Sequence, residues 1–246
     1  MRYERREGEA SEAASFACSS LGAELLDDPS TDPAIVDRMV RDIAVANRWL
    51  GGWAAVRFGL ARLLSAADRG REFTLLDVGA GAADIPRHAV RWAARRDIVL
   101  RAVALDRIPA AARVARENGI PVVVASAAAL PVGERGVDIV VISQLAHHFE
   151  GKAVARLFAA CGALARRGVV VGELHRSALA RAGFRVAGGA LGLDRRTVAD
   201  GVTSLRRGYT PAELRDLCRR AGVRGAEVRA RPFWRITAWW RTDADH

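Results

Sequence analysis

The chain contains 246 residues, of which 50% are hydrophobic, and its formal net charge is +10 at pH 7. This length suffices for one large domain with a substantial core, and we do not expect two large domains. No apolar run reaches the ~18 residues of a membrane-spanning helix. The first residues mix charges of both signs and therefore predict no secretory signal. Three cysteines without a C-x-x-C pair are typical of a cytoplasmic protein.

The positive charge comes almost entirely from arginine, because Lys152 is the only lysine. Such usage is typical of a GC-rich genome whatever the function of the protein. The arginines are scattered among acids and lack the basic, aromatic-interleaved stripe of a single-strand binder. We therefore do not expect a nucleic acid as the partner, although an RNA-directed enzyme stays open as an alternative.

Residues 1–70 predict an N-terminal helical cap or lid. Residues 1–20 are small, polar and charged, which predicts a loose arm or a partly ordered helix. Asp32-Pro33 is typical of a helix start, and the apolar residues that follow repeat at helical spacing up to a Gly-Gly pair. A second helix is expected over 53–67.

From residue 73 onward, short apolar segments alternate with helical patterns. Alternation of this kind predicts a parallel sheet with helices on both faces. The expected strands are 73–78, 98–105, 121–125, 137–143 and 168–172, and helices are expected from the glycine turn at 79–81 to about 95, near 109–118 and near 152–165.

The segment after residue 173 is less regular. One or two helices are expected within an insertion at about 177–207, and Thr210-Pro211-Ala212-Glu213 predicts a capping box that opens a helix to Ala221. Residues 226–229 and 233–241 predict a closing pair of strands. The sequence thus predicts an α/β fold with a Rossmann-like, doubly wound, mostly parallel seven-stranded sheet. Its core spans 71–246 and forms a single structural unit with the cap.

A glycine turn lies between the first expected strand and the next helix. Gly79 and Gly81 permit a tight turn and a close approach of a ligand to the backbone. A G-x-G pair also occurs in dinucleotide-binding loops, but Asp84 occupies the third position of the pyrophosphate fingerprint, where a carboxylate would repel phosphate. Together with Asp77, this loop favours a ligand that carries an ammonium or sulfonium charge. A purely structural turn with Asp84 as a cap is the alternative.

Asp106 ends the second expected strand. A carboxylate at that place can accept hydrogen bonds from both hydroxyls of a ribose, as the acid at the end of the second Rossmann strand does. The alternative is a cap for the helix that starts at Pro109. Since the glycine turn and this acid occur together at the right distance, we favour ribose binding.

These residues resemble a known family. Asp77-x-Gly79-x-Gly81, Asp106, Ala129-Leu130-Pro131 and Val137–Val141 look like the motifs of class I S-adenosylmethionine-dependent methyltransferases, over residues 73–240. The run Ser143–Phe149 is similar to the segment after strand four in ubiquinone/menaquinone-type methyltransferases. Further segments look like a bacterial subgroup found among polyketide and other natural-product genes, namely 25–29, 47–52, 173–177 and 209–214.

The resemblance implies S-adenosyl-L-methionine as the cofactor. Its methionine part would be flanked by Asp77, Gly79 and Gly81, and its ribose by Asp106. The resemblance places the remaining cofactor candidates in the lid and after the strands: Asn47, Arg48, Asp84, Ser126, Ala127 and Ser143.

Two positions depart from the family pattern. Ala83 stands where glycine is commoner, and Ser126 stands where an aspartate often binds the adenine amino group. These departures leave open a relative that keeps the fold without transferring methyl groups, such as a cyclase or a binding protein.

Methyl transfer from a sulfonium requires mainly alignment of the nucleophile and exclusion of water, and a general base helps where the acceptor is a phenol or an activated carbon. We expect no metal, because clustered acids and C-x-x-C pairs are lacking. The base candidates at the carboxyl edge of the sheet are His147, His148, Glu173 and His175. The candidates for an aromatic acceptor pocket are Trp49, Trp53, Phe149 and Tyr209.

The sequence therefore predicts a cytoplasmic methyltransferase (EC 2.1.1.-) that acts on a small aromatic or polyketide-like metabolite. O-methylation of a phenol is the first expectation, and C-methylation is the second. The oligomeric state stays open, a homodimer included.

Overall fold

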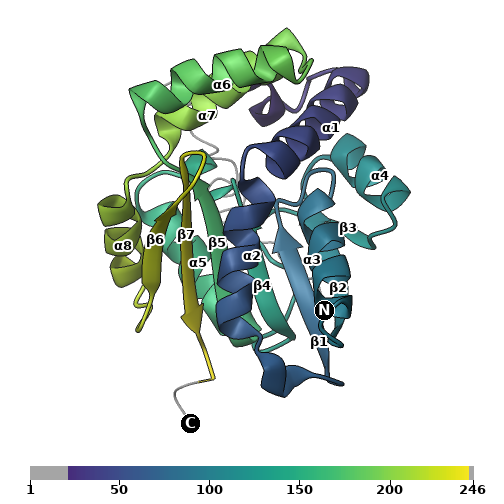
Figure 1. The fold of residues 1–246 in the computed structure, drawn as a ribbon, viewed down its shortest axis with the longest axis vertical. Coiled ribbons are helices and arrows are strands. Elements are labelled where there is room, and N and C mark those ends of the chain that lie inside the picture. Colours follow the sequence, from purple (N-terminus) through teal and green to yellow (C-terminus); the bar gives the residue numbers. More distant parts are fainter. Residues whose placement is uncertain (1–21, 244–246) are drawn as a thin grey trace, which may run out of the picture.

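A computed structural model describes residues 22–243 of the chain. The arm expected at 1–20 lies outside the described residues. The described part forms a central sheet with helices on both faces and a layer of helices across one edge of the sheet (Figure 1). The order of elements is thus the alternation of strand and helix that the apolar segments predict.

The sheet has seven strands in the order β3-β2-β1-β4-β5-β7-β6. The first five strands run parallel, whereas β7 lies antiparallel between β5 and β6. This arrangement confirms the predicted α/β, mostly parallel sheet. The strands are β1 Glu72–Val78, β2 Val99–Asp106, β3 Val122–Val124, β4 Val137–Ser143, β5 Ala165–Leu174, β6 Glu227–Arg231 and β7 Arg235–Arg241.

Helices α2, α3 and α4 cover one face of the sheet, and α5 and α8 cover the other. The expected second helix is shorter than predicted: it ends at Leu63, and a 3-10 turn, η2, follows at Ala66–Asp68. The helices are α1 Pro33–Trp49, α2 Gly52–Leu63, α3 Asp84–Ala94, α4 Pro109–Glu117, α5 Lys152–Leu164, α6 Ala178–Ala190, α7 Arg195–Arg207 and α8 Pro211–Arg220, with further 3-10 turns η1 Leu25–Asp27 and η3 Ala146–His148.

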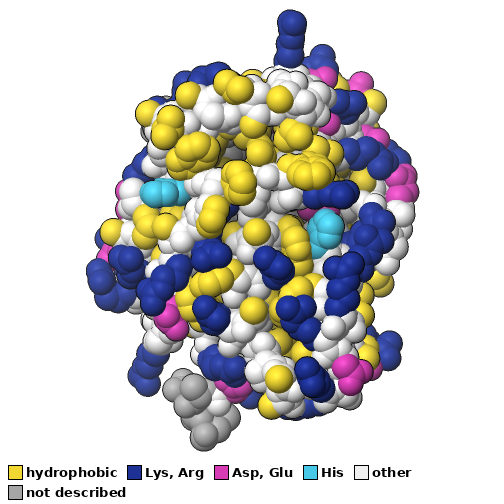
Figure 2. Space-filling model, in the orientation of Figure 1, with side chains coloured by type: hydrophobic (Ala, Val, Ile, Leu, Met, Phe, Trp, Pro, Cys, Tyr) yellow, Lys and Arg dark blue, Asp and Glu magenta, His cyan; other side chains and the backbone are white. Residues whose placement is uncertain are grey.

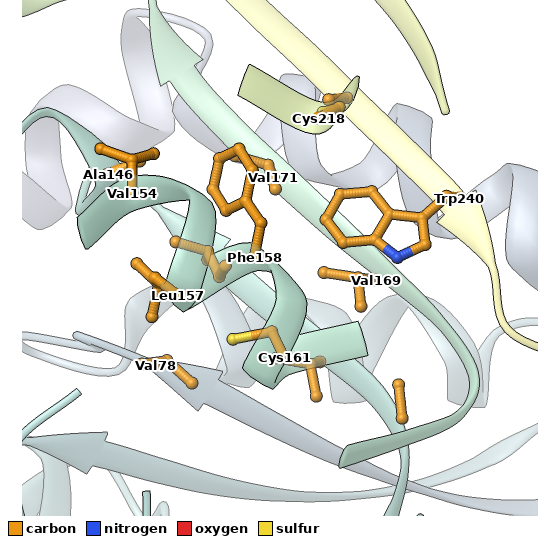
Figure 3. Packing of buried hydrophobic residues seen from close by; sticks show 14 of the residues in the cluster. Val78, Ala146, Val154, Leu157, Phe158, Cys161, Val169, Val171, Cys218 and Trp240 are labelled. Atoms are coloured by element: carbon orange, nitrogen blue, oxygen red, sulfur yellow. The ribbon is translucent and has the colours of Figure 1, made fainter. Parts of the chain in front are cut away.

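Strand residues alternate between two apolar cores. On the α2 side, Val170 of β5 packs in one cluster, whereas its neighbours Val169 and Val171 pack in the other cluster against α5. Figure 3 shows the second cluster, in which Phe158 of α5 lies close to Trp240 of β7. Burial of both faces explains why the strands read as continuous apolar runs.

Two predicted helix starts are built as the sequence indicates. The Asp32 side chain accepts the N–H of Ala34 at the start of α1. The Thr210 hydroxyl accepts the N–H of Glu213, and the Glu213 carboxylate accepts the N–H of Thr210, which is a capping box. The sequence predicts these two caps correctly because the side chain and the N–H group of each hydrogen bond are close in sequence.

Helices α1, α6 and α7 form a lid layer over the carboxyl ends of the parallel strands (Figure 1). The Asp42 carboxylate of α1 accepts the N–H of Asp194 at 2.7 Å and the hydroxyl of Thr197 at 3.0 Å, which ties α1 to α7. Among the described helices, none combines the length and the apolar character that crossing a membrane requires.

We predict that Phe158→Ala lowers the free energy of unfolding by about 3–5 kcal/mol, because a fully buried ring would leave a cavity between α5 and the sheet. Urea denaturation followed by circular dichroism measures the loss. The exposed surface variant Arg219→Ala should change the free energy of unfolding by less than about 0.5 kcal/mol. An equal loss in both variants would contradict this account of the core.

Candidate active site

A cavity of about 220 Å³ lies at the carboxyl ends of β1, β2 and β4, beneath the lid helices. Open parallel sheets place ligands at this edge. One half of the cavity is formed by the glycine turn and by the segments after β2 and β4. The other half is formed by η1, α1, α6, α7 and the turn between β6 and β7. Of the predicted site residues, those that line it are Asn47, Asp77, Gly79, Gly81, Asp84, Asp106, Ala127, Ser143, His147 and His148.

The glycine turn adopts the conformation that its sequence predicts. Gly79 and Gly81 have φ angles of 73° and 53°, a region that favours glycine. A Cβ atom on Gly79 would meet Leu145 at 2.8 Å, whereas the position above Gly81 has no atom within 4 Å. Ala83 also has a positive φ, 55°, so the turn holds alanine where the family more often has glycine. The backbone at Gly81 is therefore open to a ligand.

Asp77 is the most unusual group in the cavity. It is 1% exposed, and both carboxylate oxygens lack a hydrogen-bond partner within the described part of the chain. Burial raises its pKa well above the usual value, and the neighbouring Asp84 and Asp106 raise it further. Buried polar groups without a partner are rare in proteins, so this carboxylate indicates a ligand that supplies one.

Asp84 is the first residue of α3 and lies beside Asp77. Its Oδ1 accepts a long hydrogen bond of 3.4 Å from Asn47, and its Oδ2 has no partner within residues 22–243. Burial raises the pKa of Asp84 to about 6, against the lowering effect of Asn47. Asp77 and Asp84 thus both keep carboxylate oxygens without a hydrogen-bond partner beside the glycine turn, where the sequence predicts a cationic ligand.

A buried chain of side chains continues from Asp84 to β7. Gln144 donates to Asn47 Oδ1, and Arg235 donates to Gln144 Oε1 at 2.6 Å. Arg235 is 4% exposed, and burial lowers its pKa to about 10. Sequence reasoning missed Gln144 and Arg235. The position of Gln144 directly after β4 is the one signal that could have found it.

Asp106 performs a structural task and also faces the cavity. Its Oδ2 accepts the N–H of Gly81 at 2.8 Å, and its Oδ1 accepts the N–H of Ile108 at 2.9 Å. Burial raises its pKa despite these bonds. Each carboxylate oxygen has a further lone pair, so the contacts that fix the turn leave acceptors for a sugar hydroxyl.

His147 and Glu173 form a buried pair. The Nδ1 of His147 lies 2.9 Å from Glu173 Oε2, and Glu173 Oε1 accepts the N–H of Ala146 at 2.8 Å. Burial alone would raise the pKa of Glu173, but His147 and the backbone N–H groups lower it below its usual value. The Nε2 of His147, which lines the cavity, is buried without a partner in the described structure. This geometry suits a base whose ring a carboxylate orients.

His148 belongs to a second polar cluster, which joins η1 to α7. Its Nδ1 lies 2.9 Å from Asp27 Oδ1, and its ring lies 4.4 Å from that of His147. Arg207 pairs with Glu24 at 3.2 Å and with Asp27 at 2.8 Å. Burial would raise the pKa of Asp27, but His148 and Arg207 hold it far below the usual range. Sequence reasoning missed Glu24 and Asp27 as cavity residues, and the resemblance of residues 25–29 to the family subgroup is the signal that could have found Asp27.

Several predicted site residues lie elsewhere. The exposed Arg48 places its guanidinium over the ring of Trp49, 5.1 Å from the centroid, and does not line the cavity. The Ser126 hydroxyl accepts the N–H of Ala128 and caps a turn instead of facing the cavity. His175 bonds to Trp234 through its backbone at 2.9 Å, and its side chain is not part of the lining. Glu173 acts on the cavity only through His147.

The predicted aromatic pocket is wrong in its members. Trp49 is 57% exposed, and Trp53 stacks on His88. Phe149 packs in the α5 core, and Tyr209 also contacts that core while its hydroxyl donates to the carbonyl of Ala146 at 2.9 Å. Figure 2 shows hydrophobic side chains gathered beneath α6 on this face of the molecule. The aromatic residues that line the cavity are Phe184, Phe233 and Trp234.

Comparison with known sequences gives one family. Residues 76–171 match the family described as a methyltransferase domain. The match begins in β1, contains the glycine turn, Asp106 and the His147 segment, and ends in β5. No curated protein sequence matches the chain.

Solved structures share the fold at low sequence identity. A SAM-dependent methyltransferase from Aquifex aeolicus is 14% identical, with a TM-score of 0.57 over 86% of this chain and 98% of that protein. The plantazolicin methyltransferase BamL, solved with SAH and a desmethyl substrate analogue, is 12% identical, with a TM-score of 0.57 over 85% of this chain and 98% of that one. Human N-acetylserotonin methyltransferase, solved with SAM, is 12% identical, with a TM-score of 0.58 over 85% of this chain and 56% of that one.

We predict that Asp84 makes the ligand-free protein less stable as the pH rises from 4 to 7. Its folded-state pKa of about 6 exceeds the ordinary value of 3.8, so the folded state binds the proton more tightly than the unfolded state. Asp84→Asn should remove up to about 3 kcal/mol of this decline. Urea denaturation at several pH values measures it, with the surface variant Asp216→Asn as control. An unchanged pH slope in Asp84→Asn would contradict the burial of this charge.

Proposed function

We propose that this protein methylates a small acceptor in the cavity beneath α6, because residues 76–171 match the methyltransferase domain family and the fold is shared with S-adenosylmethionine-dependent methyltransferases. One observation carries the proposal: three residues that line the same cavity keep buried polar atoms without a partner in the described chain, namely Asp77 at both carboxylate oxygens, Asp84 at Oδ2 and His147 at Nε2. The carboxylates suit a cationic cofactor, and the imidazole suits a neutral acceptor.

The residues around the glycine turn fit the cofactor. Asp77 at both oxygens and Asp84 at Oδ2 lack hydrogen-bond partners that an ammonium group would provide, and the open space above Gly81 admits a ligand to the backbone. Asp106 offers acceptors to ribose hydroxyls, and Ala125 and Ala127 provide an apolar surface for a base. When bound, S-adenosyl-L-methionine supplies an electrophilic methyl group on a sulfonium.

The acceptor is activated at His147. Since the Nδ1 proton of a neutral ring points to the Glu173 carboxylate, the unpartnered Nε2 of this cavity-lining residue is left as the proton acceptor. Glu173 holds the ring in place and stabilises the imidazolium that forms once the acceptor proton is taken. O-methylation of a phenol is the reaction that this arrangement supports best, and the lid helices exclude water from it.

We propose a small aromatic or polyketide-like acceptor in the cytoplasm as the biological substrate. Phe184, Phe233 and Trp234 offer ring faces to such a molecule, and Leu174 and Leu205 extend the apolar wall. The structural neighbours include a methyltransferase of the natural product plantazolicin and an enzyme described as a putative O-methyltransferase, from Nostoc punctiforme. An incubation with S-adenosylmethionine and phenolic extract fractions, read out as S-adenosylhomocysteine, tests the activity.

We predict that Asp106→Ala weakens S-adenosylmethionine binding by about 1–3 kcal/mol, because buried hydrogen bonds to the ribose are lost. Isothermal calorimetry measures the affinity. An analogue that lacks both ribose hydroxyls separates this effect from loosening of the turn, since the variant and the unsubstituted protein should bind the analogue equally. If Asp106→Ala weakens both ligands alike, Asp106 acts only on the turn.

We predict that His147→Ala lowers kcat by about 100-fold or more, because general-base catalysis of this size is lost. Glu173→Gln should also lower kcat, since the ring loses the carboxylate that orients it. Calorimetry should find cofactor affinity unchanged in both variants. His175→Ala is the matched control, with kcat close to that of the unsubstituted protein. A full kcat in His147→Ala would show that the base lies elsewhere.

A further inference from the structure

The two adjacent histidines of η3 each contact a carboxylate of their own. His147 bonds through Nδ1 to Glu173, and His148 bonds through Nδ1 to Asp27, each at 2.9 Å. The rings lie 4.4 Å apart with an interplanar angle of 32°. Both residues line the cavity, so each ring is fixed from behind at Nδ1 and leaves Nε2 for a ligand.

Both Nε2 atoms are available for such a ligand. That of His147 is buried without a partner in the described chain, and that of His148 lies 3.9 Å from Glu24 Oε2, beyond hydrogen-bond distance. A carboxylate at Nδ1 places the proton of a neutral imidazole there, which leaves Nε2 as an acceptor. His147 and His148 therefore present two hydrogen-bond acceptors, and the potential ligand atoms of the two residues lie within 4.8 Å of each other.

The charge of the wall selects what these acceptors bind. Glu24 and Asp27 pair with Arg207, and Asp27 also lies 3.9 Å from Arg107. Glu173 pairs with His147, so three carboxylates face two guanidinium groups and the polar end of the cavity carries excess negative charge. A carboxylate-bearing acceptor would be repelled there, whereas neutral hydroxyl groups can donate to both nitrogens. The aromatic residues of the opposite wall, Phe184 and Trp234, suit the apolar ring that carries those hydroxyls.

Resting on the proposed function, we propose that the acceptor is a 1,3-dihydroxylated aromatic ring, whose two hydroxyls are bound by His147 and His148 together. The spacing decides between isomers. Hydroxyls on neighbouring carbons lie within hydrogen-bond distance of each other. That separation is shorter than the 4.4 Å between the centroids of the two imidazole rings, which we use as the measure of their spacing. Hydroxyls on opposite carbons point away from each other and cannot both meet one wall. His147 takes the proton of the hydroxyl that is methylated, and His148 positions the second hydroxyl.

A shared metal ion is the other occupant to be tested. Glu24, His147 and His148 each place one potential ligand atom within 4.8 Å of the others. Coordination of one ion requires the two Nε2 lone pairs to converge, whereas each ring is held at Nδ1 by its own carboxylate, Glu173 for His147 and Asp27 for His148. Arg207, which already pairs with Glu24, adds repulsion to a cation at that place. The geometry therefore favours two separate hydrogen bonds.

The test compares four probes that differ only in the second hydroxyl: 5-methylresorcinol, 4-methylcatechol, methylhydroquinone and m-cresol. Calorimetry of the full chain saturated with S-adenosylhomocysteine measures binding, and turnover with S-adenosylmethionine measures kcat/KM. We expect 5-methylresorcinol to exceed m-cresol by about tenfold or more in both, because the site's second acceptor is then paired. His148→Phe, which keeps a stacked ring, should bring this ratio close to one. The matched variant His88→Phe, at a ring stacked on Trp53 outside the cavity, should keep it.

Each result decides. The proposal is overturned if 5-methylresorcinol does not bind better than m-cresol, which includes the case in which neither probe binds. It is also overturned if His148→Phe still prefers 5-methylresorcinol to m-cresol. It is also overturned if EDTA abolishes the preference and Zn²⁺ restores it, since the pair then holds a metal. Selective binding of 5-methylresorcinol without turnover supports this site and contradicts the proposed function. Turnover of all four probes at equal kcat/KM supports the proposed function and contradicts this site.

Discussion

A buried carboxylate without a partner is the constraint on which this cavity depends. Asp77 lies at the end of the central strand, where the sheet, the glycine turn and the lid helices remove it from water. Its charge is costly there, and the neighbouring Asp84 increases the cost. Such a group is stable in a folded protein when a ligand or a proton neutralises it. The ligand-free cavity therefore favours protonated acids, whereas a bound cationic ligand favours ionised ones.

The polar groups of the cavity fall into two sets by their partners. Asp106 and Glu173 have backbone N–H donors at both oxygens, so they fix the turn after β1 and the ring of His147. Asp77, Asp84 and His147 each keep at least one buried atom unpaired. The first set keeps its geometry without a ligand, which explains how the second set can stay pointed at the cavity despite its missing contacts.

The sequence predicted those features that depend on neighbours in the chain. The β1 turn, the capping box at Thr210 and the histidines after β4 follow local patterns, and the structure places them as expected. The aromatic wall was mispredicted because the positions of Phe184 and Trp234 depend on how α6 packs on the β6–β7 turn, far away in sequence. The reach of Glu24 to the cavity depends likewise on Arg207, 183 residues later.

The two halves of the cavity come from different parts of the chain. The turn after β1, the end of β2 and the end of β4 belong to the parallel core, whereas α6 and the β6–β7 turn follow β5 and supply the aromatic residues of the cavity, Phe184, Phe233 and Trp234. The antiparallel β7 carries that turn to the cavity without disturbing the register of the parallel strands. Descendants of this chain could thus acquire new acceptors through changes in α6 and the β6–β7 turn, while the half of the pocket that belongs to the parallel core retained its ligand.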